Sequence, residues 1–286
     1  MSPNETAPRL GYIGLGNMGA PMAMRLVDWP GGLTVFDVRT EAMTPLAEAG
    51  AALADSVAAV VAAEVISVTV LDDPQVRAVV AELAGAARPG TVIAIHSTIS
   101  DTTAAELADE LRPHGIHLID APVSGGAGAA EKGQLATMVG AERAVYDTVK
   151  PVFKQWASVV IHAGDPGAGT RMKLARNMLT FTGYAAAGEA MRLAEAAGLD
   201  LQALGRVVRH TDALTGGPGA IMFRDSTAAL TADDFLYRPL SHTRDLGEKD
   251  LTLALELGEA SGVALPLAQL ALRRLAIGLG VAPDTD

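Results

Sequence analysis

A glycine-rich turn near the N-terminus constrains the fold more than any other feature of the sequence. The pattern G-x-G-x-x-G runs from Gly14 to Gly19, between the apolar run Leu10–Ile13 and a helix-like segment. In such a strand–turn–helix, the first glycine permits a tight turn, the second lets the backbone approach a pyrophosphate, and the third allows close helix–strand packing. The free N–H groups at the helix start favour bound phosphate. The turn therefore predicts a dinucleotide-binding domain, whose expected contacts are Gly14, Leu15, Gly16, Asn17, Met18 and Gly19.

A second strand-like run, Leu33–Phe36, ends in an acidic residue, Asp37, 18 positions after Gly19. A carboxylate at this place can accept hydrogen bonds from the adenosine ribose hydroxyls and repels a 2′-phosphate. Arg39 follows two residues later and could instead meet a 2′-phosphate. The sequence therefore favours NAD as the cofactor and leaves NADP open. The alternative interpretation of Asp37 is a turn residue at a strand end.

The composition limits the classes of function that the chain can serve. Its 286 residues suffice for two domains. It contains no cysteine, which excludes disulfides and thiolate metal sites and fits a reducing cytoplasm. Its formal net charge of −11 argues against a general nucleic-acid surface. We therefore expect a cytoplasmic protein that binds a small molecule and holds no metal ion.

No segment has the pattern of a membrane span or of a signal peptide. The most apolar stretch, Ala51–Leu71, is interrupted by Asp55 and Glu64, whereas a spanning helix needs about 20 largely apolar residues. Residues Met1–Pro8 lack the basic and apolar regions of a signal peptide. We expect neither a membrane anchor nor a secretion leader.

Strand-like and helix-like segments alternate through the first half of the chain. Ala-rich segments with helical spacing, such as Pro74–Ala84 and Thr102–Leu111, separate most of the strands. This alternation predicts an α/β fold with a mostly parallel sheet that is covered on both faces. The later connections are shorter and allow antiparallel pairs. The predicted strands are Arg9–Ile13, Leu33–Phe36, Val65–Leu71, Thr91–Ile95, Ile116–Ile119, Leu135–Val139 and Val159–His162.

The pattern becomes entirely helical after the turn Gly164–Gly167. A proline-free stretch from Gly169 to Ala197 predicts one helix near 30 residues, against a usual length of about 11–12. We predict a Rossmann-type dinucleotide-binding domain over residues 1–165 and an all-α substrate and dimerisation domain over residues 166–286, joined by this long helix. A small helical domain often completes its core against a second subunit, so we expect a homodimer or homotetramer. The further predicted helices are Leu201–His210, Leu240–Ser261 and Pro266–Leu279.

Two segments carry the side chains expected to handle a substrate. Ser124, Gly125 and Gly126 follow a predicted strand and can grip a carboxylate with neutral donors, although the same pattern suits a flexible turn. Lys173 and Asn177 are four residues apart on the long helix and share one face. A lone lysine is usually a solvated charge, but the residues around this one are apolar. Service as a base near neutral pH requires burial or a nearby cation to lower its pKa.

Three further residues are expected at the cofactor. Thr98, in the loop Ser97–Ser100 after a predicted strand, and Leu71, at the end of another, should face the nicotinamide end. An ordinary cap for the helix starting near Asp101 is the alternative interpretation of that loop. Lys249 lies in the segment E-K-D-L, which we expect to begin a helix and to clamp the cofactor cleft, although charges at a helix start are common.

Four motifs together resemble the β-hydroxyacid dehydrogenase family, which includes 3-hydroxyisobutyrate, tartronate semialdehyde and 6-phosphogluconate dehydrogenases. They are G-L-G-N-M-G at 14–19, D-A-P-V-S-G-G at 120–126, G-x-G-x-x-x-K-x-x-x-N at 167–177 and K-D-L at 249–251. The resemblance implies NAD(P)-dependent oxidation of a small 3-hydroxy acid with Lys173 as general acid/base. It also implies that Asn177 and residues 124–126 bind substrate, and that Thr98 and Lys249 lie near the cofactor.

Some positions depart from the family pattern and keep alternatives open. The run Leu71–Pro74 carries two carboxylates where many members have L-P-N, and Thr215–Ala220 lacks the serine and tryptophan typical of 3-hydroxyisobutyrate enzymes. The substrate identity therefore cannot be carried over. An imine reductase, a decarboxylating sugar-acid dehydrogenase and a non-catalytic dinucleotide-binding module are the alternatives, and the retained Lys173 argues against the first and the last.

Overall fold

The computed structural model describes residues 7–281. Its contacts divide the chain into two compact units, Met1–Asn177 and Met178–Asp286. Most of the segment Met1–Pro8, for which we expect no signal peptide, lies outside the described residues. Within the described part, no helix is long and apolar enough to cross a membrane.

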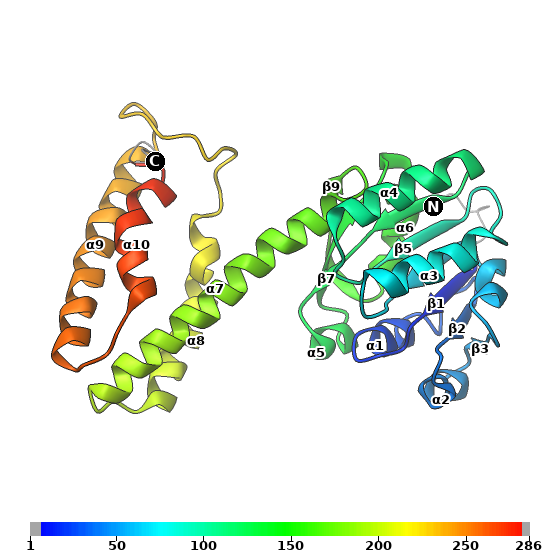
Figure 1. Cartoon of the computed structure of the whole chain (residues 1–286), viewed down its shortest axis with the longest axis horizontal. Coiled ribbons are helices and arrows are strands. Elements are labelled where there is room, and N and C mark those ends of the chain that lie inside the picture. The colour runs from blue at the N-terminus through cyan, green and yellow to red at the C-terminus, as the bar shows by residue number, and fades with distance from the viewer. Residues whose placement is uncertain (1–6, 282–286) are drawn as a thin grey trace. The chain divides into compact units, whose positions relative to one another are not determined.

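The first unit is built on a sheet to which residues 7–281 contribute nine strands (Figure 1). The strand order is β3-β2-β1-β4-β5-β6-β8-β7, and β9 also pairs with β8. Pairing is parallel from β3 to β6 and between β8 and β9, whereas β8 runs antiparallel to β6 and β7. The strands are β1 Leu10–Ile13, β2 Leu33–Phe36, β3 Ala52–Leu53, β4 Val65–Val68, β5 Val92–Ile95, β6 His117–Asp120, β7 Val123–Ser124, β8 Leu135–Gly140 and β9 Ala157–Gly164.

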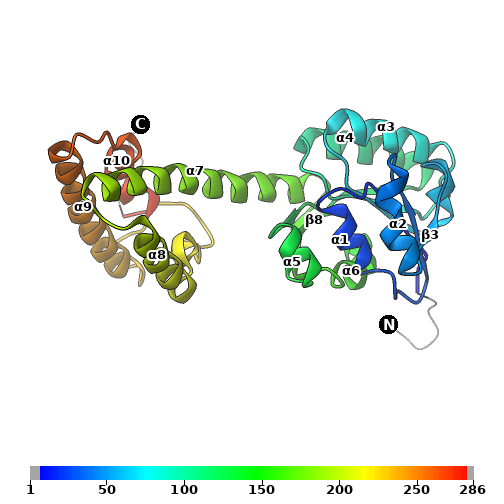
Figure 2. The same cartoon turned by 90° about the horizontal axis from the view of Figure 1, so that it is seen from below.

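Helices cover both faces of this sheet, as the alternating sequence predicts (Figure 2). Alternate residues of β1 point to opposite faces, so Tyr12 joins one buried cluster and Ile13 the other. One face is covered by α1 Gly19–Met24, α2 Thr40–Glu48 and α6 Arg143–Phe153; the other by α3 Asp73–Ala84 and α4 Asp101–Leu111. Short helices complete the unit: α5 Ala127–Glu131 and the 3-10 turns η1 Ala58–Ala62 and η2 Arg112–His114. The predicted Rossmann-type fold class is confirmed.

The second unit is helical among its described residues, also as predicted. The long helix α7 runs from Ala168 to Ala196 and continues across the division between the two units. Asp200 caps the next helix by accepting from the N–H of Gln202, and Gly216 ends it in the left-handed region at φ +85°. The other elements are α8 Leu201–Thr215, η3 Gly217–Ile221, α9 Tyr237–Ala260 and α10 Pro266–Gly278.

The compact units meet inside α7, whereas the predicted domain boundary follows residue 165. The reason is close packing between the start of α7 and the sheet. A Cβ on Gly169 would lie 2.3 Å from the Met138 carbonyl oxygen and 2.9 Å from that of Asp120. The first turns of α7 therefore belong to the packing of the first unit, and they carry Lys173 and Asn177 with them.

Candidate active site

A cavity of about 950 Å³ opens at the carboxyl ends of β1, β2 and β4. This is the edge at which open α/β sheets bind their ligands. The glycine turn forms one wall of the cavity, and residues after β4 and along α3 form another. Seven of the predicted cofactor residues line it: Gly14, Gly16, Asn17, Met18, Gly19, Asp37 and Leu71.

The three glycines of the turn have the geometry that their predicted roles require. Gly14 has φ +90°, and a Cβ there would lie 2.1 Å from the Thr69 carbonyl oxygen. A Cβ on Gly19 would lie 1.9 Å from the Gly14 carbonyl oxygen. A Cβ on Gly16 would meet nothing within 4 Å. The first and third glycines are therefore required by packing, and the second leaves open space beside the backbone.

Asp37 is held at the cavity wall by its neighbours and is 7% exposed. One carboxylate oxygen accepts from the Leu15 N–H at 2.6 Å, and the other accepts from the Arg39 N–H at 2.9 Å. The Arg39 guanidinium lies 3.4 Å from the second oxygen. Burial acts to raise the pKa of Asp37, but the hydrogen bonds from Arg39 and Leu15 and the Arg39 charge lower it overall. The side chain therefore carries a negative charge at neutral pH.

The loops after β4 and β5 form one connected structure beside the cavity. The Ser97 hydroxyl accepts from the Val70 N–H at 2.9 Å and donates to the Val70 carbonyl at 2.6 Å. Strand β4 ends at Val68, so the predicted strand Val65–Leu71 is too long and Leu71 lies in the loop, 80% exposed. Thr98 is exposed next to Ser97 and is not among the residues that line the cavity.

The predicted carboxylate-binding loop follows the short strand β7. Ser124 is half-buried, and Gly125 and Gly126 are exposed. Both glycines have positive φ, +134° and +77°, which other residues rarely adopt. A Cβ on Gly126 would meet nothing within 4 Å. The loop therefore lies at an open surface, with two exposed glycines beside the half-buried Ser124.

Lys173 is buried at the root of this loop, on the first turns of α7. Its side chain is 9% exposed, and its Nζ donates to the Val123 carbonyl at 2.6 Å. Burial, and secondly the positive charge of Arg176, lower the pKa of Lys173. Asn177 lies one helical turn further and is half-buried. The structure thus brings the predicted base and the Ser124–Gly126 loop together and supplies the burial that the sequence requires.

Asp120 is a positioning residue that the sequence does not reveal. Its carboxylate is fully buried and accepts from the Gly167 N–H at 2.7 Å and the Thr170 N–H at 2.5 Å. It therefore anchors the N-terminal turn of α7 to the end of β6. A Cβ on Gly140 would lie 2.1 Å from an oxygen of this carboxylate. The signal available in the sequence is an acidic residue that directly follows a buried apolar strand.

Lys249 lies within α9, in the second unit, and not at a helix start. The prediction that E-K-D-L begins a helix is therefore wrong. The helix already begins at Tyr237, where Asp234 accepts from the Leu236 N–H at 2.9 Å and provides the cap. Lys249 is exposed and pairs with the neighbouring Asp250 at 3.1 Å.

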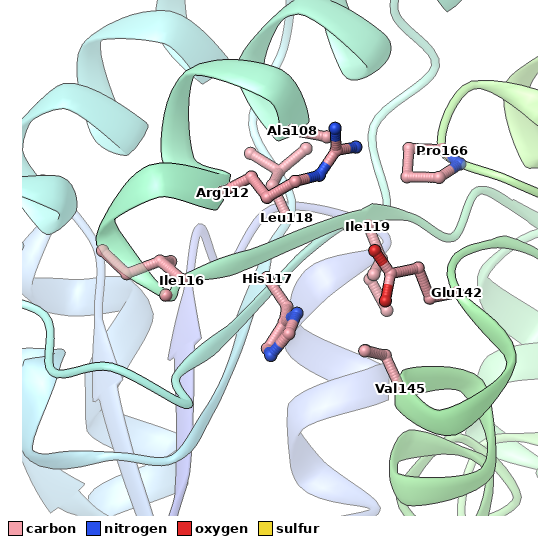
Figure 3. Close-up of a pocket in the computed structure, with 10 residues that line it drawn as sticks. Ala108, Arg112, Ile116, His117, Leu118, Ile119, Glu142, Val145 and Pro166 are labelled. Carbon is pink, nitrogen blue, oxygen red and sulfur yellow. The ribbon is translucent and has the colours of Figure 1, made fainter.

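A second cavity in the first unit measures about 50 Å³ (Figure 3). It is lined by Arg112, His117 and Glu142 among others and has room for a few water molecules. It is too small for a dinucleotide. Among the described residues, no three His, Asp or Glu side chains gather as metal ligands. The cavity beside the glycine turn is the candidate cofactor site, because seven of the predicted cofactor residues line it.

Two family models match most of the chain. The NAD binding domain of 6-phosphogluconate dehydrogenase matches residues 9–164. The model described as NAD-binding of NADP-dependent 3-hydroxyisobutyrate dehydrogenase matches residues 167–279. The chain therefore consists largely of NAD(P)-binding domains, as the glycine turn predicts.

Curated relatives cover nearly the full length of the chain. An uncharacterised oxidoreductase of Mycobacterium tuberculosis is 65% identical over 100% of this chain and 98% of its own length. The 2-(hydroxymethyl)glutarate dehydrogenase of Eubacterium barkeri is 32% identical, covering 96% of this chain and 92% of its own. The NAD-dependent L-serine dehydrogenase of Pseudomonas aeruginosa is 33% identical, and the match covers 92% of this chain and 90% of the relative.

Solved structures share the same architecture. An oxidoreductase from Mycobacterium avium 104 has a TM-score of 0.94 at 75% identity, covering 96% of this chain and 99% of its own. The 3-hydroxyisobutyrate dehydrogenase of Mycobacterium tuberculosis with L-serine has a TM-score of 0.67 at 30% identity, covering 96% of each. An imine reductase from Myxococcus stipitatus, variant V8, with NAD+ has a TM-score of 0.76 at 21% identity, and the match covers 97% of this chain and 96% of that chain. The last similarity shows the fold alone.

Proposed function

The chain belongs to the β-hydroxyacid dehydrogenase family, and on that premise we propose that it oxidises a small 3-hydroxy acid with a nicotinamide cofactor. One observation carries the proposal. The buried Lys173 amine, with its lowered pKa, is hydrogen-bonded to the carbonyl directly before the Ser124–Gly126 loop. A base and a carboxylate-binding loop at this spacing suit a substrate whose hydroxyl lies a short distance from its carboxylate.

The names of the relatives point to one substrate class. 3-Hydroxyisobutyrate, L-serine and 2-(hydroxymethyl)glutarate each carry a CH2OH group on the carbon next to a carboxylate. We therefore propose a 2-substituted 3-hydroxypropanoate as the substrate. The carboxylate would bind at Ser124, Gly125 and Gly126, and the CH2OH group would face Lys173. The 2-substituent is the variable part of this class.

The proposed mechanism assigns one task to each residue. A bound nicotinamide ring supplies the hydride acceptor at its C4 atom. In its neutral form, the Lys173 amine accepts the hydroxyl proton as the substrate C3–H bond breaks, the carbonyl forms, and the hydride leaves with its electron pair. Asn177, one turn along the same helix, holds the hydroxyl in line. In the reverse direction the Lys173 ammonium returns the proton to the oxygen of the aldehyde. General acid–base catalysis of this kind contributes about 10²–10⁴-fold.

The cavity wall favours NAD over NADP in this proposal. Asp37 is ionised at the end of β2, where its carboxylate can accept from ribose hydroxyls and repels a 2′-phosphate. Glu82 on α3 adds a second carboxylate to the lining. The Arg39 guanidinium is already engaged with Asp37 at 3.4 Å. NADP would therefore meet more repulsion than attraction at this wall.

A panel of 2- and 3-hydroxy acids assayed for NAD(P)+ reduction tests the activity. Replacing Lys173 with Met should lower kcat by about 10²–10⁴-fold and leave nucleotide affinity unchanged, because the amine acts on the substrate proton alone. Lys154→Met is the matched control, since Lys154 is exposed at the end of α6. Turnover near the wild-type rate in K173M would remove Lys173 from the mechanism.

An imine reductase remains the second candidate, because the fold matches that of the Myxococcus stipitatus enzyme. The retained Lys173 opposes it. Oxidation of NADH or NADPH in the presence of cyclic imines, with no turnover of hydroxy acids, would favour the reductase. Tight cofactor binding without turnover of either panel would favour a non-catalytic dinucleotide-binding module.

The assembly proposed for this enzyme is a homodimer, with a homotetramer as the larger alternative. The buried apolar cluster described in the second unit is small, comprising Leu240, Leu279 and Val281. Large apolar side chains on the same unit are exposed, Leu214 by 74% and Met222 by 72%. Burying such side chains against a second copy would extend this core. Light scattering at several protein concentrations would measure the mass, and a monomer throughout would contradict the proposal.

A further inference from the structure

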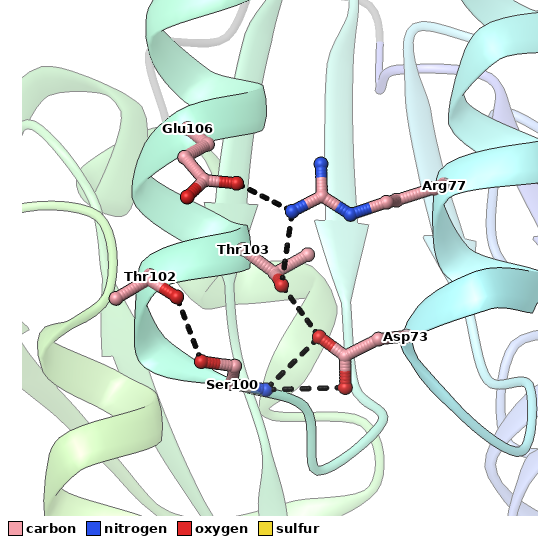
Figure 4. Close-up of polar contacts among 6 residues, drawn as sticks. All are labelled: Asp73, Arg77, Ser100, Thr102, Thr103 and Glu106. Atoms are coloured by element: carbon pink, nitrogen blue, oxygen red, sulfur yellow. Dashed lines mark hydrogen bonds and ion pairs between the residues drawn. The ribbon is translucent and has the colours of Figure 1, made fainter.

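The two consecutive carboxylates Asp72 and Asp73 depart from the family pattern at the cavity wall, and the structure gives them different tasks. Asp72 accepts from the Gln75 N–H at 3.0 Å and so caps α3, the helix that it precedes. Asp73 faces away from that helix end and reaches the next loop (Figure 4). Neither residue is among those that line the large cavity. The extra negative charges therefore do not form the cofactor wall itself.

Asp73, at the start of α3, binds the first turn of the neighbouring helix α4. Its carboxylate accepts from the Ser100 N–H at 3.1 and 3.3 Å and from the Thr103 hydroxyl at 2.5 Å. Ser100 is the N-cap residue of α4, but its own side chain makes no capping hydrogen bond. A residue 27 positions earlier in the chain thus supplies the cap for this helix. The same carboxylate fixes the point at which the loop Ser97–Ser100 ends.

A second set of hydrogen bonds and ion pairs joins α3 and α4 further along the two helices. The Arg77 guanidinium donates to the Thr103 hydroxyl oxygen at 3.2 Å and to the Glu106 carboxylate (Figure 4). Ser97, at the other end of the loop, is bonded to both backbone groups of Val70. The loop that carries Thr98 is therefore fixed at both ends, by Ser97 to the segment after β4 and by Asp73 to the start of α3.

We propose that Asp73 is a positioning residue for the nicotinamide half of the cofactor. It acts through the loop Ser97–Ser100, which carries Thr98, the residue that we expect at the nicotinamide end. The inference rests on the cofactor orientation of the proposed function, with the adenosine ribose at Asp37 and the nicotinamide beyond β4. Strands β4 and β5, whose loops Asp73 joins, lie on the opposite side of β1 from β2, which ends at Asp37. Loosening the Asp73 contacts should affect the nicotinamide half and spare the adenosine half.

Binding of two nucleotides that differ only in the nicotinamide group tests this separation. We expect Asp73→Ala to weaken the affinity for NAD+ by about tenfold. The affinity for ADP-ribose should stay within about twofold of the wild type. A tenfold loss corresponds to the contribution of about one charge-assisted hydrogen bond. Asp73→Asn retains an oxygen that can accept from Ser100 and Thr103, so it should restore most of the NAD+ affinity. Titration calorimetry measures both ligands without any hydroxy acid.

Asp72→Ala is the matched control, because it removes a helix cap one residue away without touching the loop Ser97–Ser100. It should lower the melting temperature but leave the ratio of the two affinities unchanged. Should the Asp73→Ala protein fail to fold, Thr103→Val removes one donor to Asp73 and should shift the ratio in the same direction by a smaller factor. If the affinities for NAD+ and ADP-ribose fell by the same factor in these variants, or did not change, the inference would be overturned. Because no hydroxy acid enters the assay, an inactive substrate panel would leave this result standing.

Discussion

At the scale of single residues, we expect the charge at the end of β2 to determine whether NAD or NADP binds more tightly. Each oxygen of Asp37 accepts a hydrogen bond from a backbone N–H group, and the Arg39 guanidinium, whose side chain is 56% exposed, lies beside them. Replacing Asp37 with Ser removes the repulsion of a 2′-phosphate and releases Arg39 to bind it. We expect the ratio of kcat/KM for NADP+ to that for NAD+ to rise by about 10- to 100-fold, as for charged hydrogen bonds of about 1.5–3 kcal/mol.

Initial rates with both cofactors measure this ratio, and the double variant D37S/R39A serves as the control. The gain with NADP+ should be smaller in the double variant, because the repulsion is still removed but the guanidinium that binds the 2′-phosphate is absent. If D37S left the ratio of kcat/KM for the two cofactors unchanged, the assignment of Asp37 to the ribose would be wrong.

Residue-level prediction from the sequence succeeds where the partners are close in the chain. The tasks of Gly14, Gly16 and Gly19 follow from one local turn, and the geometry agrees with them. Asp120 could not be assigned in this way, because its hydrogen-bond donors lie 47 and 50 residues later. The Asp73 cap of α4 is hidden for the same reason. A carboxylate's partner becomes visible only once the fold brings the two segments together.

At the scale of elements, the close approach of α7 to the sheet determines where Lys173 lies. A Cβ on Gly169 would lie 2.3 Å from the Met138 carbonyl oxygen, so Gly169→Ala must shift α7 or strand β8. We expect a loss of about 1–3 kcal/mol in the free energy of unfolding, as for other overpacked sites. We also expect a fall in kcat that exceeds any change in nucleotide affinity, because the shift moves the Lys173 amine.

Gly183→Ala on the same helix provides the matched control. A Cβ at Gly183 would meet nothing within 4 Å. Alanine is a better helix former than glycine by about 0.8–1 kcal/mol, so this variant should be as stable as the wild type or more stable. Urea unfolding and steady-state rates would distinguish the two variants. Equal stability of G169A and G183A would contradict the packing argument.

The sequence predicts the elements that carry an apolar run or a helical pattern, but not the shortest strands. The buried strands β1, β4 and β5 and the helix α7 follow from apolar runs and from the absence of proline. The two-residue strands β3 and β7 were not predicted, because two residues carry no periodicity and pair only where a neighbouring strand is present. The position of K-D-L inside α9 was misjudged, since charged residues suit a helix interior as well as its start.

At the scale of the whole molecule, the two-part organisation could be predicted from one change of pattern at Gly164–Gly167. The two family models meet at the same place, one ending at residue 164 and the other beginning at residue 167. The compact units divide later, inside α7, because the close packing of Gly169 and the Asp120 cap hold the first turns of that helix to the sheet. The sequence pattern therefore indicates where the secondary structure changes, whereas the contacts show where the packing of the first unit ends.

The stability of the first unit should depend on pH through a buried histidine in its core. His96 is 3% exposed, its ring nitrogens contact the Ala121 carbonyl at 2.8 Å and the Ser67 hydroxyl at 3.0 Å, and Phe153 and Trp156 pack against it. Burial lowers the pKa of His96 to about 4, although the hydrogen bond with Ala121 acts in the opposite direction. The neutral ring is therefore the form that the fold accepts.

Because the ring binds a proton more weakly in the folded chain, the unfolded chain takes up more protons as the pH falls from about 6.5 to about 4. Stability should fall across this window and be unaffected by His96 above it. At about 1.4 kcal/mol per pH unit, the loss between pH 7 and about pH 4.5 is about 2–3 kcal/mol. Asp37, whose pKa is lowered, contributes a loss only at more acidic pH.

Urea unfolding followed by circular dichroism at several pH values measures this dependence. His96→Asn keeps hydrogen-bonding groups at the site but does not titrate, so its free energy of unfolding should fall by about 2–3 kcal/mol less than that of the wild type between pH 7 and about pH 4.5. The comparison uses the slopes, because the substitution also changes the packing against Phe153 and Trp156. Parallel curves for the two proteins would show that His96 binds its proton equally well in the folded and the unfolded chain.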